Sequence, residues 1–226
     1  MLIEISALYI GSYLLGSIPT AYIIGRLVRG VDIRGYGSGN VGSANLYEHV
    51  GKRWVVPLVA VEVLLKGAVP IWVAVYVLDI SRSSAFLIGP PLLAITGNNW
   101  SAFLKLQGGR GVAVAAGTLL ALSPVLLVVC AVIATGGWRI TRSSGLWVLI
   151  SLTLLPLWAY LVHDNLNLVW YCLGLLGIVV LKRLSANWTP FPEGVPRKKV
   201  LFNRLVRDRD VSDRTGWVRR IPEGSS

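Results

Sequence analysis

Charged residues are scarce in this chain: only 15% of its 226 residues are Asp, Glu, Lys or Arg, and 54% are hydrophobic. A soluble domain carries about a quarter charged residues. Residues 5–24 hold no charge at all, and a helix of this length crosses about 30 Å of hydrocarbon. Glu4, rather than a basic residue, precedes this run, which is also longer than the apolar part of a signal peptide. The composition excludes a soluble protein and predicts an integral membrane protein.

Histidine and cysteine are equally scarce, with two residues of each. His49 and His163 are expected on opposite faces of the membrane, and Cys130 and Cys172 lie inside apolar runs without CxxC spacing. A zinc site, a Ser-His-Asp triad and an HxxxxD acyltransferase dyad are therefore excluded. We expect no metal and no cofactor, so any catalysis must rest on positioning, on oxyanion stabilisation or on a base supplied by the substrate.

Acidic residues are also few, at 11 against 22 basic ones, and the formal net charge is +11. Nine of the basic residues lie between Arg197 and Arg220, interleaved with three Asp residues, and most others lie in short loops beside apolar runs. This distribution is typical of cytoplasmic anchoring beside anionic lipid. We therefore expect membrane lipid, and not nucleic acid, as a partner.

Seven apolar runs contain Gly and Trp and lack the alternation of barrel strands, so we expect an all-α polytopic membrane protein. Pro124 divides the stretch 112–138, because proline cannot continue a helical hydrogen-bond ladder. An undivided helix gives six spans and places basic loops on both faces, whereas seven spans put the N-terminus outside and the C-terminus in the cytoplasm, as the positive-inside bias requires. Two of the seven are short and are expected to be tilted or flanked by thinned bilayer. The runs are 3–27, 55–78, 85–97, 112–122, 125–138, 146–162 and 168–182.

The chain divides into a membrane-embedded domain at 1–190 and a basic cytoplasmic tail at 191–226. We expect a multi-pass protein of the cell inner (plasma) membrane. The tail sequence RLVRDRDVSDRTGWVRR fits either a helix lying on the membrane or a solvated flank, because its charges are mixed.

A first glycine-rich loop, DIRGYGSGNVGSAN, occupies residues 32–45. Gly37 and Gly39 allow positive φ, so successive backbone amides can converge on an anion. Ser38 and Asn40 add a hydroxyl and an amide donor. The loop is thus a candidate oxyanion receptor, although Gly-Ser-Gly-Asn is also a common plain turn.

A second glycine-rich loop, GNNWSAFLKLQGGRGV, spans residues 97–112. Gly108, Gly109 and Gly111 surround Arg110 just before a helix that is expected to begin near Val112. Backbone amides at a helix start and a forked guanidinium suit phosphate oxygens. A membrane-flanking Arg in a flexible turn is the alternative, but two such loops on one predicted face favour an anion site.

Lys66 is expected well inside the second apolar run, with Glu62 one turn earlier. Their i, i+4 spacing places both on one helix face, where they can neutralise each other. Charges inside a membrane are costly and usually line a cavity or a site. A substrate-binding role for Lys66 and a self-satisfied structural pair both fit this pattern.

Three stretches together resemble a known family. The sequence GSYLLGSIPTAYIIGRLVRGVDIRGYGSGNVGSAN (11–45), the Lys66-Gly67 pair and GNNWSAFLKLQGGRGVAV (97–114) are similar to the acyl-phosphate:glycerol-3-phosphate acyltransferases of bacterial membranes. The resemblance implies a seven-helix bundle with three cytoplasmic motifs. It also implies acyl transfer from acyl phosphate to glycerol 3-phosphate, yielding lysophosphatidate without coenzyme A or metal.

The resemblance also implies functional positions. Arg110 stands where the family has Lys or Arg, and Lys182, Arg183 and Asn187 align with the third motif. The remaining motif positions are Ser38, Gly39, Asn40, Asn45, Lys66, Gly108, Gly109 and Gly111.

Departures from the family pattern cluster around the expected acceptor site. Ala44 replaces a Thr, Glu48 an Arg, Asn98 a His and Gly145 a Ser. An Arg-to-Glu change beside a phosphate reverses the local electrostatic sign, and a pair of unit charges there is worth about 4 kcal/mol at an effective dielectric of 20.

Three hypotheses follow. In the first, the chain is an acyltransferase of this family. The GSGN and GGRG loops, with Ser38, Asn40 and Arg110 as catalytic groups, hold acyl phosphate and stabilise the oxyanion, while Asn98 contributes to substrate binding. In the second the acceptor is changed, and in the third the protein binds phospholipid without catalysis. The side chains expected to orient the acceptor are Lys66, Arg142, Lys182 and Asn187.

Overall fold

The computed structural model describes residues 2–211, 213–218 and 220. All regular structure in this part of the chain is helical, and each predicted apolar run contains a helix. The long helices are α1 (Leu2–Ser17), α2 (Thr20–Arg29), α4 (Val55–Ala60), η3 (Val61–Ala68), α5 (Val69–Tyr76), α6 (Gly89–Asn99), α7 (Val112–Leu122), α8 (Pro124–Thr141), α9 (Ser144–Val162) and α10 (Leu166–Ser185), where α4, η3 and α5 run on as one helix. The short ones are η1 (Ile33–Gly35), α3 (Ser43–His49), η2 (Lys52–Trp54), η4 (Ala85–Ile88), η5 (Ala102–Leu104), η6 (Ala186–Trp188), α11 (Arg197–Phe202), η7 (Asn203–Arg207) and α12 (Arg214–Val218).

Helix length and composition support the membrane interpretation. In the described residues, five helical stretches are long and apolar enough to cross a membrane, while α6 and α7 have only 11 residues each, as short as the sequence predicted. The predicted break at Pro124 is confirmed: Ser123 Oγ caps α8 by accepting a hydrogen bond from Leu126 N at 3.3 Å. The all-helical fold is thus confirmed, and the number of crossings and the orientation of the termini stay predictions.

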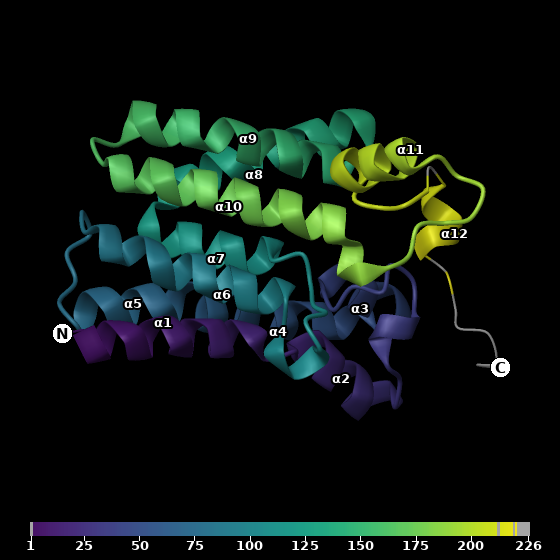
Figure 1. Ribbon diagram of the computed structural model, residues 1–226, viewed down its shortest axis with the longest axis horizontal. Helices are drawn as coiled ribbons and strands as arrows, with labels where there is room; N and C mark the ends of the chain where they lie inside the picture. Colours follow the sequence, from purple (N-terminus) through teal and green to yellow (C-terminus); the bar gives the residue numbers. More distant parts are fainter. Residues whose placement is uncertain (1, 212, 219, 221–226) are drawn as a thin grey trace.

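The helices form two packed groups, with α8, α9 and α10 lying over α1, α5, α6 and α7 (Figure 1). The largest hydrophobic cluster joins these groups and includes the buried side chains of Ile95, Leu119, Leu155, Tyr171 and Leu175. The N-terminus lies at the opposite end of the bundle from α11 and α12, and α12 lies near α3, where His49 Nε2 is 2.9 Å from Val218 O (Figure 1). The helices therefore present two separate sets of loops.

Glycines allow two pairs of helices to approach closely. A Cβ added to Gly97 of α6 would overlap the carbonyl oxygen of Tyr13 in α1. A Cβ on Gly67 of η3 would lie 2.5 Å from Val114 O of α7, and one on Gly117 would overlap the Val63 carbonyl. Small residues at such crossings let helix backbones pack directly in membranes. The crossing of η3 with α7 fixes where α7 begins.

The loops that contain Arg82, Ser123 and His163 meet at the end of the bundle near the N-terminus, here named the turn end. Ser123 Oγ lies 2.7 Å from His163 Nε2, and Arg82 Nη1 donates to the carbonyl of Ala121 at 3.1 Å. Asn165 Nδ2 in turn donates to Arg82 O at 3.2 Å. These three predicted outer loops are thus joined by their own hydrogen bonds.

The opposite end, here named the motif end, holds both glycine-rich loops, the end of α10 and the C-terminal tail (Figure 1). The tail folds back on α9 and α10 through η7. Its Arg204 and Asp210, only 3% and 2% exposed, form an ion pair at 2.6 Å. This burial contradicts the solvated-flank interpretation for Arg204 and Asp210, while Lys198 and Lys199 at the start of the tail are exposed.

Candidate active site

The GSGN loop is folded by its own neighbours. Gly37 and Gly39 have φ of 50° and 69°, the left-handed region that favours glycine. The side-chain amide of Asn45 is buried beneath the loop and holds it together. Asn45 Nδ2 donates to the carbonyls of Ile33 and Tyr36 at 2.9 Å and of Asn40 at 3.1 Å.

An acidic residue also braces the start of this loop. The carboxylate of Asp32 accepts hydrogen bonds from Arg34 Nη2 at 2.7 Å and from Arg34 Nε at 3.0 Å. These bonds stabilise the ionised carboxylate and lower the pKa of Asp32 below its ordinary value of 3.8. Arg34 is thereby committed to the loop's structure.

Three of the glycine-loop amides are used within the protein. The Gly39 amide donates to Tyr36 O at 2.9 Å, and the Gly109 amide to Asn98 O at 2.9 Å. The Gly108 amide donates to the side chain of Asn187 at 3.0 Å. Because protein oxygens already use these three amides, an anion has to rely on other donors, which include side chains and the start of α7.

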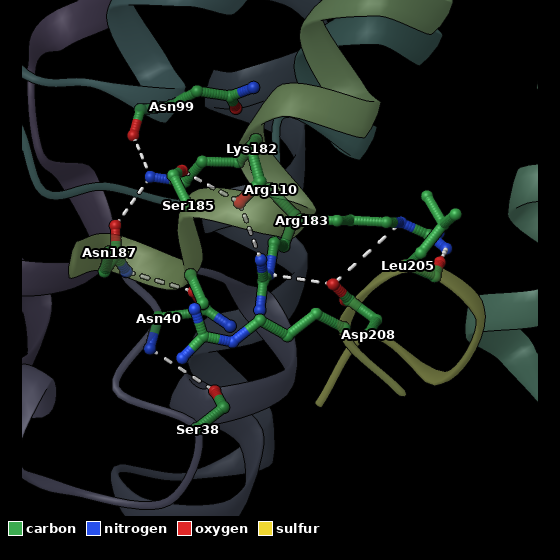
Figure 2. A network of polar contacts seen from close by, with 12 residues as sticks. Ser38, Asn40, Asn99, Arg110, Lys182, Arg183, Ser185, Asn187, Leu205 and Asp208 are labelled. Carbon is green, nitrogen blue, oxygen red and sulfur yellow. Dashed lines mark hydrogen bonds and ion pairs between the residues drawn. The ribbon is translucent and has the colours of Figure 1, made fainter. Parts of the chain in front are cut away.

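Arg110 and Asn40 meet, although 70 positions separate them in the sequence. With the Asn40 amide turned so that its oxygen faces the guanidinium, that oxygen accepts from Arg110 Nε at 3.0 Å and from Nη2 at 3.2 Å. Arg110 Nη1 also donates to the carbonyl of Lys182 at 3.2 Å (Figure 2). The central geometric expectation from the sequence, that the two loops converge, is confirmed.

Asn187 ties the two loops together. Its Nδ2 donates to Gly108 O at 3.0 Å and to Gly39 O at 3.4 Å, while its Oδ1 accepts from the Gly108 amide. Asn187 and its neighbours Ala186 and Trp188 all have positive φ, of 55°, 42° and 65°. Such backbone is strained in residues other than glycine and persists where surrounding contacts hold it. The strained turn aims the Asn187 side chain between the loops.

Lys182 holds the Asn187 side chain in this position. It is 1% exposed, and its ammonium donates to Asn187 Oδ1 at 2.6 Å and to the carbonyl of Asn99. The ammonium also lies 5.4 Å from the centre of the Trp100 ring. Lys182 therefore contacts the substrate region through Asn187.

Lys66 and Glu62 form a buried pair on η3, which is a π-helical stretch. Lys66 Nζ lies 3.8 Å from Glu62 Oε1 and donates to Asn98 Oδ1 at 3.2 Å. The charges pair as the structural interpretation predicts, while a substrate-binding role for Lys66 stays a prediction. Glu62 and Asn98 line the cavity described next, and Lys66 is not among the residues that line it. π-Helical stretches are often found at functional sites.

A cavity of about 300 Å³ lies between the two loops, η3, α9 and the tail. Ser38, Asn40 and Arg110 line it, as do the first residues of α7. Val112, Ala113 and Val148 supply an apolar part of the wall. Among the described residues, no cluster of three His, Cys, Asp or Glu side chains is placed to hold a metal ion. Polar donors thus face a chamber that also has apolar walls.

Two residues singled out from the sequence lie apart from this cavity. Arg142 is exposed at the end of α8, with its guanidinium 5.5 Å from the Trp138 ring centre. Glu48, which carries the sign reversal inferred from the sequence, is exposed on α3. Neither is among the residues that line the cavity, whereas Gly145 and Asn98 are.

Sequence reasoning missed the contribution of the tail. Asp208 Oδ1 lies 3.1 Å from Arg110 Nε and 3.9 Å from Arg183 Nε (Figure 2). Arg207 and Arg209 also line the cavity. The only signal in the sequence was the alternation of Asp with Arg, which solvated segments share.

Comparison with known proteins shows which family the chain belongs to. The family model described as glycerol-3-phosphate acyltransferase matches residues 6–190. The chain belongs to this family. It is similar to glycerol-3-phosphate acyltransferase 4 of Dehalococcoides mccartyi (strain CBDB1), with 34% identity over 92% of this chain and 90% of the relative. It is also similar to the enzyme of Desulforudis audaxviator (strain MP104C), with 39% identity over 65% of this chain and 71% of the relative.

Solved structures share the fold. The chain is 28% identical to the crystal structure of PlsY (YgiH), an integral membrane glycerol 3-phosphate acyltransferase, in its glycerol 3-phosphate form, with a TM-score of 0.73 over 80% of this chain and 88% of that one. The lysophosphatidic acid form aligns with a TM-score of 0.74 at 26% identity, over 92% and 94%. This family member is therefore an all-helical integral membrane protein, and its family match stops short of the tail.

Proposed function

We propose that this chain transfers a fatty acyl group from acyl phosphate to glycerol 3-phosphate, giving lysophosphatidate and inorganic phosphate. Family membership supports the reaction class. The observation that carries the proposal for this chain is the meeting of Arg110 with Asn40 on the wall of a cavity of about 300 Å³. A guanidinium and an amide placed there suit the phosphate and carbonyl oxygens of one activated acyl donor.

The donor phosphate is held by Arg110 together with the start of α7. The first residues of α7 line the cavity, and the unpaired amides and dipole of a helix N-terminus favour an anion. Ser38 and Asn40 also line the cavity and donate to the carbonyl oxygen as it gains charge.

Acyl transfer then needs only one displacement. The acceptor hydroxyl attacks the acyl carbon, the tetrahedral intermediate collapses, and the carbon–oxygen bond to phosphate breaks. The cavity's two carboxylates, Glu62 and Asp208, are each paired with a cation. A phosphate oxygen of the substrates therefore takes the hydroxyl proton, and inorganic phosphate leaves with the bonding electron pair.

We place the motif end in the cytoplasm and the protein in the cell inner (plasma) membrane. The basic loop residues gather at the motif end, while Arg82 lies at the turn end, which fits the positive-inside bias. Labelling of single cysteines tests this orientation. A membrane-impermeant maleimide should modify Ser83→Cys in intact cells and Lys105→Cys only after permeabilisation, and the reverse pattern contradicts it.

The activity test uses purified protein in detergent with palmitoyl phosphate and glycerol 3-phosphate. We expect lysophosphatidate by mass spectrometry, with phosphate released in equal amount, and loss of both in Arg110→Ala. Lysophosphatidate no higher than in a protein-free blank contradicts the proposal. Retained binding of palmitoyl phosphate without turnover would instead support the non-catalytic hypothesis.

A changed acceptor remains a second candidate because Asn98 lines the cavity in place of the family's His. A neutral amide there, held by Lys66, lowers the positive charge available to a phosphate. Equimolar competition between glycerol 3-phosphate and glycerol decides between the two. Acyl transfer mainly to glycerol supports a changed acceptor, and transfer mainly to glycerol 3-phosphate contradicts that hypothesis.

A further inference from the structure

The C-terminal tail is anchored to the membrane domain by one buried arginine. Arg204 pairs with Asp210 and donates to the carbonyl of Leu184 at 3.2 Å and to that of Thr189 at 2.8 Å. Its guanidinium also lies 4.8 Å from the centre of the Phe191 ring. Removing one partner of a buried ion pair leaves an uncompensated charge and costs about 3–5 kcal/mol, so Arg204 and Asp210 are kept together. The segment between Arg204 and Asp210 is therefore held in place at both ends.

Asp208 lies within this anchored segment and lines the cavity. Its carboxylate points at the guanidinium of Arg110 (Figure 2). Its φ of 57° turns the chain at the end of η7. Arg183 strengthens the arrangement, because its Nη1 donates to Leu205 O at 2.7 Å and its Nε faces Asp208 at 3.9 Å. The backbone thus presents the carboxylate to Arg110 at 3.1 Å from Nε.

Arg110 needs such a partner because its own loop does not fix its orientation. It lies between Gly109 and Gly111, which carry no side chain to pack against the guanidinium. The Lys182 carbonyl accepts from Nη1, and Asp208 Oδ1 forms an ion pair with the guanidinium, 3.1 Å from Nε and without a hydrogen bond. The Nε and Nη2 edge faces the Asn40 oxygen.

We propose that Asp208 is a positioning residue for Arg110, supplied by a tail outside the 6–190 segment that the family model matches. The inference rests on the proposed acyl transfer and adds the carboxylate that orients its phosphate-binding cation. Arg110, Arg183, Arg207 and Arg209 line the cavity against Glu62 and Asp208, so four cations less two anions leave +2. Cations therefore outnumber anions on the cavity wall with Asp208 in place.

The experiment measures kcat and KM for palmitoyl phosphate in Asp208→Asn, which removes the charge and keeps the size. We expect kcat/KM to fall at least about tenfold, because misplacement of a catalytic group by 1 Å can cost about 10²-fold. Asp208→Glu should recover part of this loss. Glu193→Gln, an exposed charge change in the same tail, should match the wild type.

A double-mutant cycle separates positioning from general destabilisation. If Asp208 acts through Arg110, then Asp208→Asn should change kcat/KM less than about twofold in an Arg110→Lys background. An undiminished effect there, or no effect in the wild-type background, overturns the inference. A lower KM with unchanged kcat also overturns it, because Asp208 would then be competing with the substrate phosphate.

The inference can fail separately from the proposed function. Absence of turnover in the wild type contradicts the proposed function alone. Thermal-shift titration with inorganic phosphate still tests Asp208 in that case. Weaker phosphate binding by Asp208→Asn, with Glu193→Gln unchanged, supports positioning, and equal or tighter binding refutes it.

Discussion

The turn end and the motif end both gather polar side chains from loops that are distant in sequence, yet they use them differently. At the turn end, Ser123 bonds His163, and Arg82 bonds a backbone carbonyl. At the motif end, comparable groups surround a cavity of about 300 Å³ and include more cations than anions. The first cluster satisfies itself, whereas the second leaves positive charge facing a space.

This contrast teaches how a polar cluster inside a membrane bundle can be interpreted. Buried polar groups must find partners, so any set of loops that closes a bundle will form hydrogen bonds. Hydrogen bonds between loops therefore do not by themselves mark a site. The excess of charge over internal partners does, because that excess requires a ligand or a counter-ion.

Arginine at each end gives the sharpest contrast. We expect Arg110→Ala to lower kcat/KM for palmitoyl phosphate by about 10²–10³-fold, since it removes a charged donor from the reacting group. Arg82→Ala at the turn end should stay within about twofold of the wild type, because no substrate contact is lost there. Steady-state kinetics measures both, and similar losses at the two ends would break the comparison.

Asparagine at each end gives a smaller contrast. Asn187→Ala removes the bridge between the two loops and should lower kcat/KM by about 10–100-fold through misplacement of Arg110 and Asn40. Asn167→Ala removes one bond to the Ser83 carbonyl at the turn end and should leave kinetics unchanged. Activity retained in Asn187→Ala would show that Lys182 alone holds the loops.

A substitution at the turn end should lower the stability of the fold without lowering the activity. Ser123→Ala removes the cap of α8 and the partner of His163, so we expect the free energy of unfolding to fall by about 1 kcal/mol. The measurement is the thermal midpoint in detergent, alongside kcat/KM. A parallel loss of activity would mean that the two ends are coupled.

The smallest expected effect concerns acid stability at the motif end. The folded-state pKa of Asp32 is lowered by hydrogen bonds from Arg34, so its stabilisation is present above pH 3.8 and is lost as the pH falls through the lower folded value. Asp32→Asn should remove this part of the pH dependence, worth at most about 1 kcal/mol because the pair is partly exposed. Unfolding profiles from pH 2 to about pH 6 test it, and an unchanged slope in Asp32→Asn contradicts it.

Helices and their breaks were predictable because their causes are local. A continuous apolar run, Pro124 or a glycine at the start of a loop determines the backbone conformation of the few residues around it. The convergence of Asn40 with Arg110 was also predictable, because both loops fall on one face once the spans alternate. The internal use of three glycine amides could not be predicted, since hydrogen-bond partners such as Asn187 come from a distant part of the chain.

The role of the tail could not be predicted for a similar reason. Arg204 and Asp210 look like surface charges in the sequence, and only tertiary packing against α10 buries them. Arg142 shows the converse, since its position beside a motif suggested a site role while its side chain lies over Trp138. Single-residue charge carries little information about where a long, flexible side chain will go.

Gly67 and Gly117 carry a last consequence. They sit where η3 and α7 touch backbone to backbone, and α7 is the helix that Arg110 precedes. An added methyl group at either position would push the two backbones apart and carry the guanidinium away from Glu62. Two glycines that do not line the cavity thus control the spacing of the helices beside it, and with that spacing the width of the ligand that the cavity accepts.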